Sequence, residues 1–260
     1  MGKASGVTAA VVLIGDEVLS GRTQDRNLQQ IAQFLAPLGI NVVECRTIPD
    51  DADVIADTVN TLRAQVDYVF TTGGIGPTHD DITADSIAAA FGVEIDVRPD
   101  ALEVIEHWYM KTRTPLTESR KRMARIPDGA SLIVNPVTGA PGFQIGNVFV
   151  MAGVPSITRG MLEDVAHRLH GGAVTRSRSV KADNMREGDI AIPLGEMQAR
   201  YPQVSIGSYP YFLEVQDGEG KRGTHLVARA TDDVALDAVI GEIAAMVAAL
   251  GFDGRIDPED

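Results

Sequence analysis

Apolar runs and apolar helical stripes alternate along the N-terminal part of the chain. Val7–Ile14 is an almost unbroken apolar run, which is typical of a parallel strand buried on both faces. The same rhythm continues with a helical stripe of Leu28, Ile31, Leu35 and Leu38 that stops at Gly39, a strand over Ile40–Cys45, a helix carrying Ile55, Val59, Leu62 and Val66, and a strand over Asp67–Thr71. This strand–helix order predicts a parallel sheet with helices on both of its faces.

Capping signals predict where the next helices begin. Thr83 offers a hydroxyl that could cap free amides, and Asp85 in the first turn would complement the helix dipole. Asp100 and Glu103 have the spacing of a capping box, and Thr114-Pro115 offers a cap followed by a first-turn proline. A hairpin and a closing helix follow, over Phe143–Ile145, the turn Gly146-Asn147, Val148–Met151, and the stripe Ile157, Met161, Val165 and Leu169.

A second, smaller domain is predicted after the polar segment His170–Arg178, which gives domains of residues 1–172 and 173–260. Its expected elements are strands over Ser179–Ala182, Val204–Ser208, Phe212–Val215 and Thr224–Ala230, a turn over Asp217–Gly223, and helices over Ile190–Arg200 and Asp233–Leu250. Pro193 should lie in a first helical turn, because proline is costly farther inside a helix. The predicted fold class is α/β, with a doubly wound, mainly parallel sheet flanked by helices and a small C-terminal α+β domain.

The chain is acidic, with 36 Asp and Glu against 23 Lys and Arg and a formal net charge of −13. Such a surface repels a phosphate backbone, so we expect no nucleic-acid partner. The basic cluster of Arg120, Lys121, Arg122 and Arg125 is interpreted as the solvated face of one helix, with a ligand-facing role as the alternative. The apolar runs are shorter than the roughly 20 residues of a membrane helix, no signal peptide is evident, and Cys45 is the single cysteine. We therefore expect a cytoplasmic protein with no membrane partner.

The segment TTGGIGPTHDD, Thr71–Asp81, follows a strand and precedes a helix, the place where open parallel sheets bind ligands. Its glycines would let several backbone N–H groups approach one anion. The candidate phosphate-binding residues are Thr72, Gly73, Gly74, Gly76, Pro77, Thr78 and Thr83. Asp80 and Asp81 would repel a phosphate unless a cation lies between them, so we predict a metal there.

Two further loops carry candidate ligand-binding residues. The loop after the first strand offers Gly15, Asp16, Glu17, Asp25 and Asn27 for a metal, a ribose hydroxyl or a base, with a helix cap as the alternative for Asp25 and Asn27. Asn135–Gly142 has the turn chemistry of a lid, and could equally be structural. In SYPY, Ser208–Tyr211, the two tyrosines could stack on a base, although packing at a strand edge is the simpler interpretation.

These motifs together resemble one family. Gly15-Asp16-Glu17, the Asp25/Asn27 pair, Asp50, TTGGIGPTHDD with Thr83, Asn135 with Gly142, and Gly153-Val154-Pro155 follow its order. The chain resembles the molybdopterin-binding-like (MoaB/MogA/CinA N-terminal) family, in the short CinA-like branch related to the first domain of eukaryotic FAD synthases. The third loop departs from the family pattern, because T-G-A-P-G stands where G-T-A-P-G is commoner.

The resemblance implies a divalent-metal-dependent nucleotide pyrophosphatase acting on ADP-ribose or FAD. Asp80 and Asp81, with Asp16, would be catalytic and hold Co²⁺ or Mg²⁺, with a monovalent cation as a further candidate. Asp25, Asn27 and Asp50 would contact ribose or base. The alternatives are a protein that binds molybdopterin without hydrolysis and a non-catalytic oligomeric scaffold. A homo-oligomer, dimer or trimer, is expected in each case.

Overall fold

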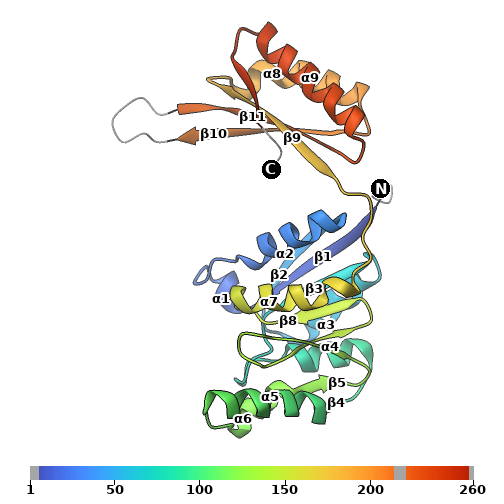
Figure 1. Ribbon diagram of the computed structural model, residues 1–260, viewed down its shortest axis with the longest axis vertical. Coiled ribbons are helices and arrows are strands. Elements are labelled where there is room, and N and C mark those ends of the chain that lie inside the picture. Colours follow the sequence, from blue (N-terminus) through green and yellow to red (C-terminus); the bar gives the residue numbers. More distant parts are fainter. Residues whose placement is uncertain (1–5, 214–220, 258–260) are drawn as a thin grey trace. The chain divides into compact units, whose positions relative to one another are not determined.

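The computed structural model describes residues 6–213 and 221–257. The chain divides into two compact units, Met1–Ala173 and Val174–Asp260 (Figure 1). Each unit has its own hydrophobic core, two apolar clusters in the first and one in the second. Among the described residues, no helix is long and apolar enough to cross a membrane.

The first unit is built on a six-stranded sheet with the strand order β2-β1-β3-β8-β7-β6. These strands are β1 (Val7–Ile14), β2 (Ile40–Ile48), β3 (Tyr68–Thr72), β6 (Ser131–Ile133), β7 (Gly142–Ile145) and β8 (Val148–Met151). The four strands from β2 to β8 run parallel, whereas β7 is antiparallel to both of its neighbours. The predicted mainly parallel sheet and the hairpin at Gly146-Asn147 are therefore confirmed.

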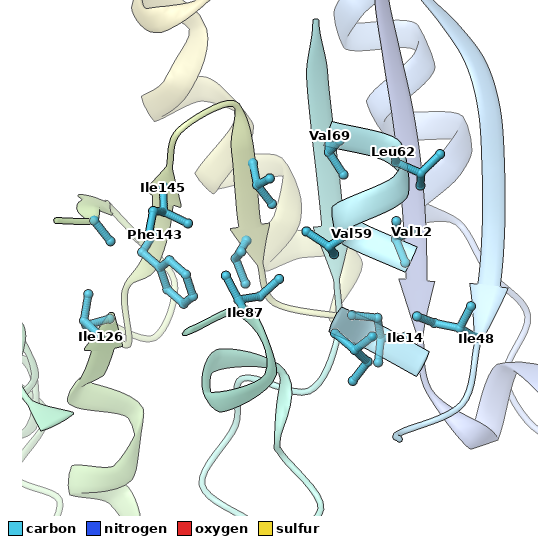
Figure 2. Packing of buried hydrophobic residues seen from close by; sticks show 14 of the residues in the cluster. Val12, Ile14, Ile48, Val59, Leu62, Val69, Ile87, Ile126, Phe143 and Ile145 are labelled. Carbon is cyan, nitrogen blue, oxygen red and sulfur yellow. The ribbon is translucent and has the colours of Figure 1, made fainter. Parts of the chain in front are cut away.

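Helices cover both faces of this sheet, as a doubly wound fold requires. One core is closed by α2 (Asn27–Leu35) and α7 (Pro155–Val165), and the other by α3 (Ala52–Arg63), α4 (Thr83–Phe91) and α5 (Pro99–Thr112). Alternate residues of β1 enter the two cores, Ala9, Val11 and Leu13 on one face and Ala10, Val12 and Ile14 on the other. Figure 2 shows Val12, Val59 and Val69 pointing into the second core. Burial on both faces explains why this strand has no polar alternation.

Short elements complete the first unit. They are α1 (Asp16–Leu19), η1 (Ala36–Leu38), β4 (Ile95–Val97), α6 (Glu118–Lys121), η2 (Arg122–Ala124), β5 (Arg125–Pro127) and η3 (Ala166–Arg168). Strands β4 and β5 pair with each other in a separate two-stranded sheet. Neither these two strands nor β6 was predicted, because three residues give too short an alternation to detect.

The carboxyl ends of the parallel strands lie at one edge of the sheet. Ile14 at the end of β1 pairs with Ile48 at the end of β2, and Thr72 at the end of β3 pairs with Met151 of β8. Consequently the loops that follow β1, β2, β3 and β8 meet there, which is where doubly wound sheets bind their ligands.

The second unit has the order strand, helix, strand, strand, helix, strand. Its elements are β9 (Arg176–Asp183), α8 (Glu187–Arg200), β10 (Ser205–Leu213), β11 (Lys221–Ala230), α9 (Asp233–Ala249) and β12 (Gly254–Asp257). The antiparallel sheet has the order β10-β11-β9-β12, which is the ferredoxin-like arrangement. Both helices pack on the same face of this sheet (Figure 1).

The predicted start of α4 at Thr83 is confirmed, whereas α6 begins at Glu118 and not directly after Thr114-Pro115, and the predicted side-chain caps were wrong. The N-cap residues of α4, α5 and α6 are Ile82, Arg98 and Thr117, and none of the three caps its helix with a side-chain hydrogen bond. Asp100 instead pairs with Arg98, with its Oδ1 2.7 Å from Nε. A neighbouring side chain thus competes with the backbone amides for the carboxylate of Asp100.

Proline positions explain two further corrections. The two strands predicted around Ser208 and Phe212 are one continuous strand, β10, with Pro210 inside it. Because β10 is an edge strand, the missing N–H of this proline leaves no neighbouring strand unpaired. Pro193 lies well inside α8, which begins at Glu187, and not in its first turn. Residues 214–215 of the predicted strand and 217–220 of the predicted turn lie outside the described part of the chain, and residues 221–223 of that turn belong to β11.

Candidate functional site

The glycine loop after β3 is fixed by close backbone contacts. Gly73 has φ +106°, and a Cβ there would lie 2.1 Å from the carbonyl oxygen of Ile14. Gly74 has φ +65°, and a Cβ there would lie 2.2 Å from Oγ1 of Thr83. The amide of Gly73 donates to the carbonyl of Met151 at 3.1 Å. Only glycine fits these positions, so the loop is held between the end of β1 and the start of α4.

Several polar groups of this loop have no hydrogen-bond partner among the described residues. In the described ranges, the main-chain N–H groups of Gly74, Ile75 and Gly76 donate to no acceptor. Oγ1 of Thr83 is buried beside Gly74 and also has no hydrogen-bond partner there. Successive free amides in a turn form a cradle for an anion. The loop therefore has free donors of the kind that the predicted phosphate site needs, whereas the predicted helix cap by the Thr83 hydroxyl is not formed.

Asp80 and Asp81 have different environments. Oδ2 of Asp81 accepts hydrogen bonds from the backbone N–H of Thr78 at 2.8 Å and from its hydroxyl at 2.5 Å. The same carboxylate would lie 2.6 Å from a Cβ on Gly76, so it is folded back onto the loop behind Pro77. The Asp80 side chain is 67% exposed, and the Thr78 side chain holds its pKa below the usual value. The two carboxylates do not face each other as a pair.

Asp50, which follows β2, lies beside the glycine loop together with other acidic residues. Its Oδ2 accepts a hydrogen bond from the amide of Asp16 at 3.0 Å. Its Oδ1 would lie 3.5 Å from a Cβ on Gly74. Burial, with the nearby charges of Glu17, Asp16 and Asp80, raises the pKa of Asp50. Four carboxylates thus surround one side of the anion cradle.

These acids do not form a finished metal site. Within residues 6–213 and 221–257, no three His, Cys, Asp or Glu side chains are close enough to hold a metal ion by themselves. Carboxylate oxygens are nevertheless the donors that Mg²⁺ takes, and Mg²⁺ is commonly bound by one or two carboxylates completed by substrate phosphates and water. The residues present therefore fit a cation that binds together with a phosphorylated ligand.

Asp25 and Asn27 lie on the other side of the loop, where they have structural bonds. Asp25 accepts from the amides of Asn27 and Leu28 at 3.0 and 3.1 Å, so it caps the first turn of α2 from the position before the N-cap residue, Arg26. The Asn27 side-chain amide donates to the Gly153 carbonyl at 2.7 Å, which ties α2 to the loop after β8. Its Oδ1 is buried without a partner among the described residues. Asn27 lines a hollow of about 50 Å³ with Glu17, Asp25 and Thr72.

The third loop, Asn135–Gly142, is stabilised by hydrogen bonds between its own residues. The Asn135 side chain is 4% exposed and forms four hydrogen bonds inside the loop, to Val137, Thr138 and Ala140. A Cβ on Gly142 would lie 2.4 Å from the Val150 carbonyl, so this glycine allows β7 and β8 to approach. Both residues have structural roles, which favours the structural alternative over the ligand lid.

The basic cluster reaches the glycine loop in a way that sequence did not predict. It does not form one helix, because Lys121 ends α6, Arg122 belongs to η2, and Arg125 begins β5. Arg125 pairs with Asp85 of α4, and this pairing raises its pKa. Arg122 and Arg125 line a small hollow together with Gly76 and Asp81. Contacts of β5 with β4 and with α4 help to place these cations, so their spacing in sequence carried no signal.

Comparison with known proteins gives the family. Residues 10–171 match the family described as "Probable molybdopterin binding domain", and residues 176–252 match "FAD synthase, middle domain". An Archaeoglobus fulgidus protein is 34% identical over 77% of this chain and 84% of its own length. A CinA-like protein of Citrifermentans bemidjiense is 40% identical over 60% of this chain, but over only 38% of its own length.

A solved structure agrees with these matches. The protein CinA of Thermoplasma acidophilum, of unknown function, is 32% identical, with a TM-score of 0.58 over 64% of this chain and 99% of its own. The first family match covers more than half of the chain and contains every loop of the candidate site. The chain therefore belongs to the molybdopterin-binding-domain family, in its CinA-like branch.

Proposed function

We propose that this protein hydrolyses a nucleotide pyrophosphate of the ADP-ribose or FAD type with the help of a divalent cation, Mg²⁺ or Co²⁺. The proposal rests on one observation: the glycine loop combines groups that attract an anion with groups that repel one. The free amides of Gly74–Gly76 attract an anion, while Asp16, Glu17, Asp50 and Asp80 around them repel it. A cation bound between the phosphates and these carboxylates offsets the repulsion between them.

Each side of the loop has a role in this proposal. The amides of Gly74–Gly76 orient the phosphoryl oxygens, and Asp50 and Asp80 hold the cation against them. When bound, the cation neutralises the pyrophosphate and lowers the pKa of a bound water. The free Oδ1 of Asn27 accepts a hydrogen bond from a ribose hydroxyl or a base amine. The oxygen of water adds to one phosphorus while the bond from that phosphorus to the bridging oxygen breaks. The bridging oxygen leaves on the other phosphorus, so each product, AMP and the phosphomonoester of the other half, keeps one phosphate, and a proton of the water passes to solvent.

The test is release of AMP from ADP-ribose and from FAD by the full chain, with Mg²⁺, with Co²⁺ and with a chelator. Hydrolysis that needs a metal and falls at least about 100-fold in Asp80→Asn supports the proposal, in line with the loss of one electrostatic contact in an active site. Asp57→Asn is the matched control, because Asp57 is an exposed acid on α3, away from the loop. Metal-independent activity, or no activity on either compound, refutes the proposal.

A second candidate is binding of molybdopterin without hydrolysis. The description of the matched family and the incomplete metal site favour it. It predicts that the purified protein retains a fluorescent pterin and leaves pyrophosphates intact. Substitution of Gly74 by alanine should abolish this retention, because the added Cβ displaces the cradle.

A third candidate is an oligomeric scaffold without a ligand. A ligand that binds only the folded state raises the melting temperature, so a scaffold predicts no shift with nucleotides or pterins. The expected dimer or trimer is common to all three candidates, and light scattering of the full chain measures it.

A further inference from the structure

The face of the second unit's sheet that lies opposite α8 and α9 carries side chains for which the proposed function has no role. On the helix side, Val180, Leu226 and Ala228 form the core. The alternate positions face the other way, and none of the described helices of this unit packs on them. This face holds a hollow of about 300 Å³, the lower end of the size range of small-molecule sites.

Small side chains form the floor of the hollow and aromatic rings form its walls. Ser177, Ser179 and Val227 line it beside Tyr209 and Tyr211. Tyr209 leans toward Gly207, where a Cβ would lie 3.2 Å from its ring. Tyr211 lies over Gly223 on the neighbouring strand, where a Cβ would lie 2.6 Å from its hydroxyl oxygen. The two rings thus approach different glycines, one on the same strand and one on the neighbouring strand, and both line the hollow.

Each ring is held in place by polar partners. The Tyr211 hydroxyl donates to Asp183, and its ring lies 5.0 Å from the ring of His225 and 4.6 Å from Nζ of Lys181. Burial, with Asp183, raises the pKa of Tyr211 to about 12, so the phenol is uncharged at neutral pH. The Tyr209 hydroxyl accepts a hydrogen bond from Arg229 at 3.0 Å. These contacts already hold the two tyrosine side chains in place, so ligand binding costs less of their conformational entropy.

Arg229 gives the hollow an uncompensated positive charge. Its guanidinium contacts the hydroxyl and the ring of Tyr209, and no carboxylate pairs with it in the part of the chain that the structure describes. Two acids beside the hollow have other partners: Asp183 accepts from Tyr211, and Asp257 lies 3.6 Å from Nε of Arg255 and 3.8 Å from Nδ1 of His225. In a chain with a net charge of −13, an exposed unpaired guanidinium beside aromatic walls is complementary to an aromatic anion.

We propose that this hollow is a second ligand site, which takes a mononucleotide: the base lies between Tyr209 and the Tyr211–His225 pair, and the phosphate binds Arg229. The serine hydroxyls of Ser177 and Ser179 face the ribose. The site is separate from the glycine loop, so it does not depend on the hydrolysis proposed above.

The test is calorimetric titration of the full chain with AMP in the presence of a chelator, which prevents metal-dependent binding at the glycine loop. We expect saturable binding that Arg229→Gln and Tyr209→Leu each weaken by about fivefold or more, the usual loss for one stacking or charged contact. Arg255→Gln is the matched control, because Arg255 lies on the same sheet beside its own acid. Asp50→Asn should leave this binding unchanged.

Three results overturn the proposal. They are the absence of heat with millimolar AMP, binding that Arg229→Gln and Tyr209→Leu leave unchanged, and an affinity that rises steadily with oligonucleotide length. The last result would indicate a platform for single-stranded nucleic acid. Because Tyr209, Arg229 and Arg255 are exposed, circular dichroism of the variants at these three positions should match the parent. Pyrophosphate hydrolysis by Arg229→Gln should equal that of the parent, so failure of one proposal does not affect the other.

Discussion

Replacement of Gly74 by alanine tests the geometry of the glycine loop. Gly74 and Gly92 share the same backbone conformation, φ +65°, so an alanine at either position has the same left-handed strain. They differ in the space around them. A Cβ on Gly74 would lie 2.2 Å from Oγ1 of Thr83, whereas a Cβ on Gly92 would meet nothing within 4 Å. Gly92→Ala is therefore a control that contains the strain without the clash.

The expected magnitudes follow from these contacts. The left-handed conformation of an alanine costs about 1–2 kcal/mol, which is the whole effect expected for Gly92→Ala. Overpacking of a rigid site adds about 1–3 kcal/mol, so Gly74→Ala should lose about 2–5 kcal/mol of unfolding free energy. Thr83→Ala removes the clashing oxygen, so the double variant Gly74→Ala, Thr83→Ala should recover at least about 1 kcal/mol.

Urea denaturation followed by tryptophan fluorescence measures these values. Trp108 is the single tryptophan and lies in α5, so its emission reports the first unit even if the two units unfold separately. Equal free energies of unfolding for Gly74→Ala and Gly92→Ala would refute the close approach to Thr83. Absence of coupling with Thr83→Ala would have the same consequence.

Three further substitutions give independent checks. The pKa of Asp50 is raised in the folded protein, so its protonated carboxyl favours the folded state. This stabilisation is fully present below the unfolded pKa of about 3.9 and is lost as pH rises through the folded pKa. Asp50→Asn should therefore be more stable than the parent at pH 7 and no more stable at pH 3 in urea titrations, and a destabilised variant at pH 7 would contradict this. Asn135→Ala removes four buried hydrogen bonds and should cost about 2–4 kcal/mol in thermal unfolding, so a loss below about 1 kcal/mol would disprove the bracing role. Thr83→Val replaces an unpartnered hydroxyl and should leave stability equal or raise it by up to about 1 kcal/mol, whereas a clear loss on chemical denaturation would show an unseen partner.

Local patterns were sufficient for most long elements of the fold. The bounds of β1 were predicted at both ends, because the apolar run is long and its ends coincide with polar residues. Predictions failed where a competing contact or the place of an element in the sheet overrode the expected local preference. The predicted capping box at Asp100 is one such case, because its carboxylate bonds to Arg98. Pro210 is another, since only the edge position of β10 makes it acceptable inside a strand.

The sequence by itself determined the strand–helix order and the position of the glycine loop, because both depend on residues adjacent along the chain. The tertiary structure decided which polar groups meet at that loop. Asp50 and Asp16 are 34 positions apart, and Asn27 and Gly153 are 126 apart, so no local spacing links them. Register between parallel strands brings these groups together, and burial of both sheet faces fixes that register.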